Sequence, residues 1–547
     1  MKWWGWGAED ITFALEGRTE LLNLLEECIG PVGTEKTPPI PLDQIRLPEP
    51  ATPDDLPSKF ESLLGAAQIS TDRLVRLKHS LGRSYTDLLR LRQGQIDRAP
   101  DLVLFPRSPT DIETALRLAT ENHVSVVPFG GGTSVVGGVE ALRGNAAAGA
   151  ITLDLANLNR VIDVDEKSDV AIMQAGLSGP ALEAALREKG YTLQHFPQSF
   201  EFSTLGGWIA TRSAGQASTK YGKIEDMVLG LSMVTPVGSI TTKAAPAAAN
   251  GPSMNQWLIG SEGIFGIITE AQLKVYRIPA TQNYRGLLFK TLYDGLAAVR
   301  AIAAAQIHPA VLRLSDMEET KLSMALKGKP TSFAESLKQD LGWRYLQRKG
   351  YGWGCLMLLG LEGHEKEVAH QCRSALAIAR RYDGFDLGRG PGRKWLKSRF
   401  ELPYLRDDLL DRRVLVDTLE TATTWRNVLP LYHALTDTLT QVIGAAGRKA
   451  LVMAHISHVY STGASLYFTF ACRQCAGAEL EQWRQIKQAA TDCIMANHGV
   501  LSHHHGIGAD HAPWLEQEHG PLAMQAMRAV KQTLDPQGIM NPHKLLL

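Results

Sequence analysis

The run from position 126 to position 134 constrains the fold most, because β-branched residues there lead directly into three glycines. Val126 and Val127 favour a strand, and we expect that strand to break at Pro128. Glycines lack Cβ, so successive backbone N–H groups can turn toward one point and form a nest for an anion. The pattern indicates either a pyrophosphate cradle that follows a strand or an ordinary tight turn.

Two common phosphate-binding motifs do not fit this run. No Gly-Lys-Ser or Gly-Lys-Thr follows the glycines, which argues against a Walker-type loop. Position 135 is valine, where the dinucleotide fingerprint needs its third glycine. The ligand therefore has to be inferred from the other segments that accompany this run.

Composition and termini narrow the class of protein. The 547 residues carry no formal net charge and suffice for two or more domains, so nothing indicates a nucleic-acid partner. No apolar run reaches the roughly 18–20 residues that cross a bilayer. The N-terminus has no secretory h-region, and the final three leucines are not a peroxisomal signal. Six dispersed cysteines do not make a disulfide framework, so we expect a cytoplasmic protein.

Changes in sequence texture divide the chain into four parts. Residues 1–95 are expected to be mostly helical with a proline-rich strap, and residues 96–279 alternate short strands and helices. Residues 280–490 combine longer helices with separate strands, and residues 491–547 form a C-terminal segment. In the second part we expect a strand at 102–105, a helix from a Thr110 cap to about Asn122, strands at 151–155 and 170–174, and a helix opening at Gly179 and Pro180.

Four further segments combine glycines with small hydroxyl side chains or histidines. They are residues 196–207, 211–215, 260–270 and 502–508, the last of which reads Ser-His-His-His-Gly-Ile-Gly. Small residues let backbone amides approach a planar ring or a phosphate closely. Three adjacent histidines indicate either a functional site or a structural metal ion.

The order of these motifs resembles flavoproteins of the vanillyl-alcohol oxidase type, with a p-cresol-methylhydroxylase (PCMH)-type FAD-binding domain, over residues 96–547. Within that superfamily the chain is most similar to the alkyldihydroxyacetonephosphate synthases, also called alkylglycerone-phosphate synthases. This closer likeness is carried by Lys2, Trp3, Trp4, Gly5, Trp6, Gly7, His195, residues 199–207, Arg313, Leu314, Arg406, Asp407, residues 463–468 and the triple histidine. The resemblance implies an α+β fold with a two-subdomain FAD-binding domain, an α/β cap domain with an antiparallel sheet that binds substrate, and a C-terminal segment that returns to the flavin.

The resemblance also implies FAD as the cofactor. The glycine loop has no His or Cys that could tether a flavin, so we expect FAD to be bound non-covalently. The residues that match the family's cofactor positions are Pro128, Phe129, Gly130, Gly131, Gly132, Thr133 and Ser134 for the pyrophosphate, Gln198, Ser199, Phe200, Glu201, Phe202, Ser203, Thr204, Thr211, Arg212, Ser213 and Ala214 for the ring and ribityl, and Glu262, Gly263, Ile264, Phe265, Gly266, Ile267 and Ile268.

The reaction implied by the resemblance is a redox-neutral exchange in ether-lipid synthesis. A fatty alcohol replaces the acyl chain of acyl-dihydroxyacetone phosphate through an adduct between flavin N5 and the substrate carbon C1. The expected partners are therefore a lipid-like phosphate ester and a fatty alcohol. We also expect peripheral contact with a membrane, to which the aromatic N-terminus and the long helices would contribute, and a homodimer.

Several side chains match the family's catalytic and substrate positions. Tyr467 matches the proton donor and acceptor, and because a phenol ordinarily has a pKa of about 10, it should need a nearby positive charge. Arg406 matches the arginine that binds substrate, since a guanidinium can hold a phosphate in bidentate fashion. The other matches are Arg313 and the triple histidine His503, His504 and His505 as catalytic residues, and His195 as a substrate contact. On an extended strand, the first and third histidines would share one face.

Plainer interpretations of these residues are also open. Isolated arginines are commonly structural ion-pair residues, a tyrosine in a strand-like run is commonly a core aromatic, and His195 could cap a loop. Gln198 and Ala509 depart from the synthase pattern, and residues 539–544 resemble the ending of flavin-dependent 2-hydroxy-acid oxidases. Two rival functions follow: an FAD-dependent 2-hydroxy-acid or alcohol oxidase on the same fold, and a flavin-binding protein without catalysis. The oxidases commonly have Glu-His-Gly where this chain has His504-His505-Gly506, which counts against the first rival.

Overall fold

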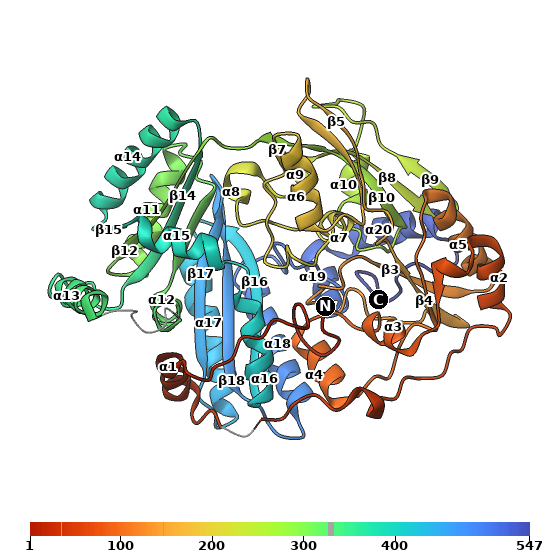
Figure 1. The fold of residues 1–547 in the computed structure, drawn as a ribbon, viewed down its shortest axis with the longest axis horizontal. Coiled ribbons are helices and arrows are strands. Elements are labelled where there is room, and N and C mark those ends of the chain that lie inside the picture. The colour runs from red at the N-terminus through yellow and green to blue at the C-terminus, as the bar shows by residue number, and fades with distance from the viewer. Residues whose placement is uncertain (34–35, 146, 327–332) are drawn as a thin grey trace.

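This computed structural model describes residues 1–33, 36–145, 147–326 and 333–547. The chain forms two large lobes, with the strands of the FAD-type region on one side of Figure 1 and a long twisted sheet on the other. Two large hydrophobic cores support these lobes, one with buried residues between Leu56 and Leu545 and the other with buried residues between Ile45 and Ile494. The predicted α+β class is confirmed by these mixed helices and sheets.

The first lobe contains two sheets of different construction. One has the order β1-β2-β4-β3, in which β2, β4 and β3 run parallel, and the other is an antiparallel sheet of order β5-β6-β10-β8-β9. Their strands are β1 (Ile69–Ser70), β2 (Leu102–Leu104), β3 (Val124–Phe129), β4 (Gly149–Asp154), β5 (Val161–Asp165), β6 (Val170–Gln174), β8 (Val228–Thr235), β9 (Gly238–Thr241) and β10 (Ile267–Lys274), with a small pair made of β7 (Tyr191–Thr192) and β11 (Tyr276–Arg277).

Two local predictions in this lobe were wrong. Strand β3 does not break at Pro128 but continues to Phe129, because β4 is its only neighbouring strand in this sheet and its other side is bridged at Val126 rather than at Pro128. Helix α5 (Pro109–Glu121) is capped by Ser108 rather than Thr110, since the Ser108 hydroxyl accepts the backbone N–H of Asp111 at 3.1 Å.

The second lobe is built on one seven-stranded antiparallel sheet of order β15-β12-β14-β13-β17-β18-β16. Its strands are β12 (Thr281–Phe289), β13 (Val311–Ser315), β14 (Cys355–Gly363), β15 (Phe385–Gly388), β16 (Val414–Thr424), β17 (Leu451–Val459) and β18 (Gly463–Arg473). Helices pack on it, including α11 (Leu292–Ala304), α14 (Glu365–Arg381), α17 (Val428–Ala445) and α18 (Glu479–Ala496). The remaining helices here are α12 (Met317–Ala325), α13 (Phe333–Arg348), α15 (Arg389–Ser398) and α16 (Leu405–Asp411).

The N-terminal region is less helical than expected. It contains α1 (Thr19–Ile29), α2 (Leu56–Leu64), α3 (Arg73–Lys78) and α4 (Tyr85–Gln93), joined by long irregular segments that include the proline-rich stretch. The prolines at 38–53 remove backbone donors and keep that stretch extended. Trp6 is 4% exposed, so the expected lipid-facing role of the aromatic N-terminus is wrong for this indole.

The C-terminal segment returns to the glycine-rich loop. The Val126 N–H donates to the Ile539 carbonyl at 2.8 Å, and the Asn541 N–H donates back to the Val126 carbonyl at 2.9 Å. This segment follows α19 (Leu515–His519) and α20 (Pro521–Leu534), while α6 (Gly179–Glu188), α7 (Leu205–Ala210), α8 (Ser218–Tyr221), α9 (Ile224–Met227) and α10 (Met254–Leu258) complete the first lobe. Among the described residues, no helix has both the length and the apolar content needed to cross a bilayer.

Candidate active site

The glycine loop after β3 is pressed against the second predicted cofactor segment. A Cβ at Gly131 would lie 1.9 Å from the carbonyl oxygen of Phe202, and one at Gly130 would lie 2.2 Å from the hydroxyl of Thr204. Gly132 has a φ of 64°, which disfavours a side chain for a separate reason. The glycines are therefore required by close approach to residues 202–204 as well as by the turn itself.

The other predicted cofactor segments join the same group. A Cβ at Gly263 would meet the Pro128 ring at 2.8 Å, and the backbone N–H of Glu262 donates to the Ala210 carbonyl at 2.9 Å. Arg212 donates to the side chain and carbonyl of Gln256. Side chains of Ile264, Phe265 and Ile267 are buried, and Phe265 also lines the cavity described below.

Unpartnered polar atoms indicate that these segments accommodate a polar group. The hydroxyls of Thr204 and Ser261 are buried and have no hydrogen-bond partner among the described residues. Both lie in segments that match the family's cofactor positions or flank them. Because buried hydroxyls are normally satisfied, a cradle free of Cβ atoms and lined by these two donors fits a phosphate-bearing cofactor.

One face of the seven-stranded sheet positions the predicted tyrosine. In the register of β16, β18 and β17, Glu420 is directly opposite Tyr467, and Tyr467 is directly opposite His455. Directly opposed residues of an antiparallel pair lie on the same face of a sheet. Glu420, Tyr467 and His455 therefore form a row across three strands.

The ring of Tyr467 is enclosed by histidines. The His455 ring lies parallel to it at 4.9 Å, and the His504 ring stacks on it at 6.0 Å. His505 meets it edge-on at 5.6 Å. Burial raises the pKa of Tyr467 to about 12, although the Thr418 hydrogen bond and the charge of Arg313 act to lower it. The phenol is therefore neutral near pH 7, and the charge of Arg313 does not offset burial.

Arg313 is tied to this row through a carboxylate. Its Nη2 lies 2.8 Å from Glu319 Oε1 and 3.1 Å from His455 Nδ1, and His455 Nδ1 lies 2.9 Å from the same Glu319 oxygen. Burial would raise the pKa of Glu319, but Arg313 and His455 hold it well below its usual range. Arg313 thus fixes Glu319 and His455 beside Tyr467. The plainer interpretation of Arg313, as a residue of a structural ion pair, therefore also fits the structure.

The triple histidine does not form the extended strand that we expected. Residues 502–507 are bent around the carboxylate of Glu420, which accepts backbone N–H groups from His503 at 2.7 Å, His504 at 3.1 Å and His505 at 2.9 Å. The Ser502 hydroxyl donates to the same carboxylate at 2.7 Å. The carboxylate of Glu420, which is distant in sequence, shapes this loop. The side chains of neighbouring residues therefore do not alternate between two faces as in a strand, and both His504 and His505 face Tyr467.

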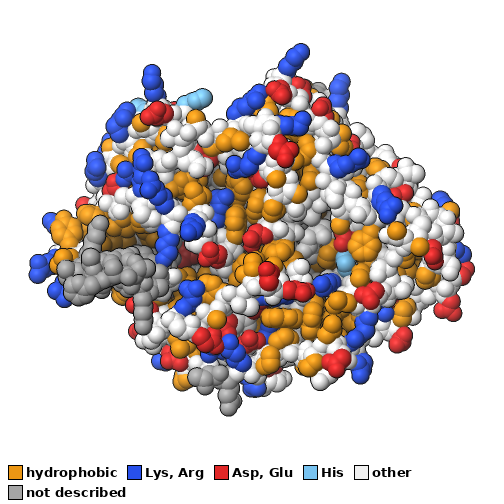
Figure 2. Space-filling view, viewed as in Figure 1, with side chains coloured by type: hydrophobic (Ala, Val, Ile, Leu, Met, Phe, Trp, Pro, Cys, Tyr) orange, Lys and Arg blue, Asp and Glu red, His pale blue; other side chains and the backbone are white. Residues whose placement is uncertain are grey.

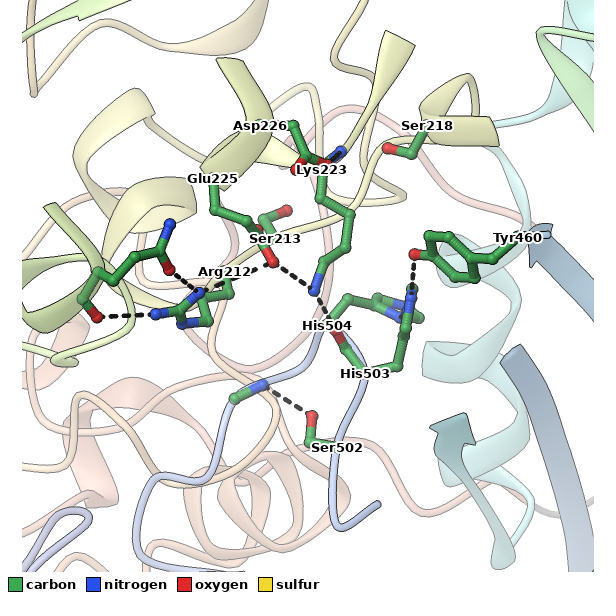
Figure 3. A network of polar contacts seen from close by, with 12 residues as sticks. Arg212, Ser213, Ser218, Lys223, Glu225, Asp226, Tyr460, Ser502, His503 and His504 are labelled. Atoms are coloured by element: carbon green, nitrogen blue, oxygen red, sulfur yellow. Dashed lines mark hydrogen bonds and ion pairs between the residues drawn. The ribbon is translucent and has the colours of Figure 1, made fainter. Parts of the chain in front are cut away.

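His503 faces a different set of partners, which Figure 3 shows from close by. The Tyr460 hydroxyl lies 2.6 Å from His503 Nε2, and Lys223 Nζ lies 2.6 Å from the His503 carbonyl and 3.1 Å from Glu225. His458 stacks on the His503 ring at 5.0 Å. One ring nitrogen each from His458, His503 and His504 lie within 4.8 Å of one another, a spacing that a metal ion could bridge.

The remaining predicted residues occupy different places. His195 is 1% exposed with its Nε2 3.2 Å from the Ser213 hydroxyl, and burial lowers its pKa to about 3. Gln198 is exposed and donates to the Arg399 carbonyl at 2.7 Å. Burial lowers the pKa of Arg406, whereas the charges of Asp407, Asp417 and Tyr467 act to raise it.

A cavity of about 550 Å³ connects the cofactor segments with the histidine loop. The residues that line it include Thr211, Lys223, Glu262, His503, His504 and Gly506. Glu262 joins the two sides, because its carboxylate accepts the backbone N–H groups of Ile507 and Gly508 at 2.7 Å each. The cavity therefore lies between two of the predicted cofactor segments, near Thr211 and Glu262, and the histidine loop at residues 502–507.

Comparison with known proteins identifies the family. Over 528 residues the chain is 36% identical to the alkyldihydroxyacetonephosphate synthase of Dictyostelium discoideum, covering 96% of this chain and 86% of the relative. The chain belongs to the alkyldihydroxyacetonephosphate synthase family. It is also 33% identical to the synthase of Trypanosoma brucei brucei over 572 residues, covering 100% of this chain and 92% of that one.

Structural and domain matches agree with this assignment. A solved alkyldihydroxyacetonephosphate synthase superposes with a TM-score of 0.85 at 32% identity, covering 99% of this chain and 97% of that one. Residues 100–243 match the family described as FAD binding domain, and residues 278–545 match FAD linked oxidases, C-terminal domain. This confirms the PCMH-type fold and FAD as the cofactor; the individual site residues and the four-part division of the chain stay predictions.

Sequence reasoning missed Glu420, His455, His458, Tyr460 and Glu319. A signal was present for two of them, because His455 and His458 stand close together before the predicted tyrosine strand. Glu420 could not be found in this way, since its partners lie 82 to 85 positions further along the chain.

Proposed function

We propose that this protein is an FAD-dependent synthase that exchanges the acyl group of acyl-dihydroxyacetone phosphate for a fatty alcohol. The C1–O bond to the acyl group breaks, the fatty acid leaves as a carboxylate, and the alcohol oxygen forms the new ether bond to C1. The observation that carries the proposal is the placement of Tyr467 between His455 and His504, because His504 also lines the cavity beside the predicted cofactor segments. Bound FAD would supply the electrophilic ring at which the substrate carbon is activated.

The residues of this chain would hold the substrate and manage its protons. Tyr467 is neutral near pH 7, so its hydroxyl is ready to donate a proton at C1, whereas it can accept the C1 proton only as the phenolate, after its own proton has passed to a neighbouring group. The guanidinium of Arg406 suits the phosphate group of the substrate. His504 and His505 confine the phenol ring, and Glu420 fixes the loop from which they project.

An assay with defined substrates tests the proposal. Purified yellow protein is incubated without oxygen with acyl-dihydroxyacetone phosphate and hexadecanol, and released fatty acid and alkyl-dihydroxyacetone phosphate are measured by mass spectrometry. We expect equal amounts of both products and no net bleaching of the flavin. Bleaching by a 2-hydroxy acid, without ether product, would contradict the proposal and favour the oxidase.

Peripheral contact with a membrane is part of this proposal. Leu341, Tyr345 and Trp353 are exposed near the end of α13, and Lys349 lies 5.9 Å from the centre of the Tyr345 ring. Orange and blue side chains lie next to one another at this edge of Figure 2. Exposed aromatic rings flanked by lysines are typical of surfaces that contact lipid headgroups. Loss of vesicle binding in a Tyr345→Ser, Trp353→Ser variant would support it, and unchanged sedimentation would contradict it.

A further inference from the structure

The first seven residues form a buried loop, here called the N-terminal loop (residues 1–7). The Lys2 N–H donates to the Gly7 carbonyl at 2.8 Å, which closes the loop on itself. Lys2 is 2% exposed and Trp6 is 4% exposed. Figure 1 shows the N-terminus near the centre of the view rather than at its rim. A lysine so deeply buried in such a loop needs a specific counter-charge.

That counter-charge is Asp407, the residue next to Arg406 on α16. Lys2 Nζ lies 3.0 Å from Asp407 Oδ2, and the backbone N–H of Trp6 donates to Oδ1 at 3.0 Å. The loop packs so tightly on this carboxylate that a Cβ at Gly5 would lie 2.5 Å from it. Both oxygens of Asp407 are therefore occupied by the N-terminal loop.

Arg83 ties the same loop to the glycine loop of the cofactor site. Its Nη2 donates to the Lys2 carbonyl at 3.0 Å, and its backbone N–H donates to the Ser134 carbonyl at 2.6 Å. The Trp6 ring also meets the Phe202 ring edge-on at 5.8 Å. The N-terminal loop thus lies between the residues that cradle the cofactor and the helix that carries Arg406.

Arg406 itself has unused hydrogen-bonding capacity. Its Nε is buried without a partner in the described part of the chain, and so is the indole Nε1 of Trp6. None of the ion pairs found between described residues joins Arg406 to Asp407, although the two are adjacent in sequence. A half-buried guanidinium whose Nε has no partner among the described residues is suited to an anionic ligand.

We propose that Lys2 is a positioning residue that neutralises Asp407, so that Arg406 stays free to bind the phosphate of the substrate. The inference rests on the proposed function for the identity of that phosphate ester. Without the ammonium group, Asp407 would be a buried carboxylate with the Trp6 amide as its donor, and Arg406 and Arg83 would be the cations whose charges still act on it. Substrate phosphate would then compete with an internal carboxylate for the same guanidinium.

The test compares variants of the full-length holoenzyme. We expect Lys2→Met to raise the KM for acyl-dihydroxyacetone phosphate at least tenfold while kcat and FAD content change less than threefold. Lys2→Arg should restore most of the affinity, because it restores the charge. The decisive variant is Lys2→Met combined with Asp407→Asn, in which the competing carboxylate is removed and the KM should return to within about threefold of the wild type.

Lys36 offers a matched control, because its partner Asp408 lies on α16 next to Asp407. Lys36 Nζ pairs with Asp408 at 2.8 Å but is partly exposed, and Asp408 is one residue further from Arg406. Lys36→Met should leave the KM unchanged. A double variant that is no better than Lys2→Met alone would overturn the proposal, and so would an unchanged KM in Lys2→Met.

Two further measurements keep the outcome decisive. Should Lys2→Met fail to fold, as judged by thermal melting, the single variant Asp407→Asn decides the question. We expect this variant to bind dihydroxyacetone phosphate at least as tightly as the wild type does in calorimetry. A tenfold loss of affinity would overturn the proposal. If wild-type protein makes no ether product, the proposed function fails, but the role of Lys2 can still be tested. Inorganic phosphate then replaces the substrate in the same calorimetric comparison. Affinity at least equal to that of the wild type supports the role of Lys2, and a tenfold loss overturns it.

Discussion

At the scale of single residues, the site depends on how one phenol is held. Tyr467 is confined by His455 and His504 and lies opposite Glu420, so its position is fixed by three separate segments of the chain. Burial that raises its pKa to about 12 keeps the proton on the oxygen near neutral pH. The neutral form is the proton donor, so the structure favours Tyr467 as an acid, and its action as a base for the C1 proton requires prior loss of the phenol proton.

Replacing this phenol should separate catalysis from binding. We expect Tyr467→Phe to retain FAD and fold normally, because the ring and its stacking contacts remain, and to lose about 10²–10⁴-fold in kcat. Absorbance spectra and steady-state assays check both parts. Activity within a few-fold of the wild type would remove Tyr467 from its assigned role.

Glu420 is expected to act through the histidine loop. In Glu420→Gln the charged acceptor of three backbone N–H groups is lost, which should lower the free energy of unfolding by about 2–3 kcal/mol and reduce kcat. Glu362 on β14 is a matched control. Its buried carboxylate accepts the Tyr284 hydroxyl at 2.7 Å, and it lies outside the row formed by Glu420, Tyr467 and His455. Glu362→Gln should lose similar stability in urea unfolding while retaining kcat; equal losses of kcat in both variants would contradict the prediction.

At the scale of elements, the glycine loop and residues 202–204 act as one unit. Gly131→Ala would place a methyl group against the backbone of Phe202, where no side-chain rotation can relieve the contact. We expect this variant to lose FAD, measured as the ratio of flavin to protein absorbance after gel filtration. Gly207→Ala is the control, because its nearest neighbour would be the Thr204 hydroxyl at 3.5 Å and it lies within α7. FAD retained by the Gly131 variant would show that this packing is not required for the cofactor.

Local elements were predictable from the sequence, and long-range contacts were not. The predicted strand at 170–174 is β6, because β-branched and apolar residues there alternate as a half-buried strand requires. The helix at 109–121 was found, but its start was misplaced by the choice between two neighbouring hydroxyl residues. The bent histidine loop was not predictable, since the carboxylate that shapes it belongs to β16 and the pairing of β16 with β18 is a tertiary contact.

In the candidate site too, some residues were predictable from local motifs, and others could be found only from contacts between distant segments. Tyr467, His504 and His505 were expected from motif resemblance and are brought together. His455 enters through the register of β17 with β18, and Glu319, on α12, enters through its contact with His455. The role of residues 1–7 is the clearest case. Their aromatic composition indicated a lipid-facing surface, but the buried ion pair between Lys2 and Asp407, 405 positions apart, draws them into the interior.

At the scale of the whole molecule, Lys2 and Lys544, near the two chain ends, are both buried among segments distant in sequence. Lys544 is fully buried with its Nζ 3.3 Å from the Glu140 carbonyl, and burial lowers its pKa to about 8. Several histidines are buried with it: desolvation lowers the pKa of His195, His505 and His511 to about 3 each. Folding therefore holds three imidazoles neutral that an unfolded chain would protonate in mild acid.

The sign of the resulting pH dependence follows from proton counts. Between pH 3 and about 6.5 the unfolded chain binds more protons at these histidines than the folded chain does, so their contribution to stability is lost as the pH falls below 6.5. Buried carboxyls act in the opposite direction, because burial raises the pKa of Glu262 and Asp510 to about 7, and the folded chain then binds more protons above pH 4.5. Comparing a single-histidine variant with the wild type separates the contribution of that histidine to the pH dependence of stability from the contributions of the carboxyls.

His511 is the suitable residue, because it contacts the Gly506 carbonyl at 3.3 Å and has no assigned role in binding or catalysis. Lowering the pH from 7.5 to 5.5 should reduce the free energy of unfolding of the wild type by about 1.4 kcal/mol through this one side chain, because its pKa in the unfolded chain is near 6.5. His511→Gln should therefore lose about that much less stability over the same interval, as measured by urea unfolding at both pH values. Equal losses in the two proteins would mean that His511 is already able to take up a proton in the folded state, and the buried, neutral imidazole inferred here would be wrong.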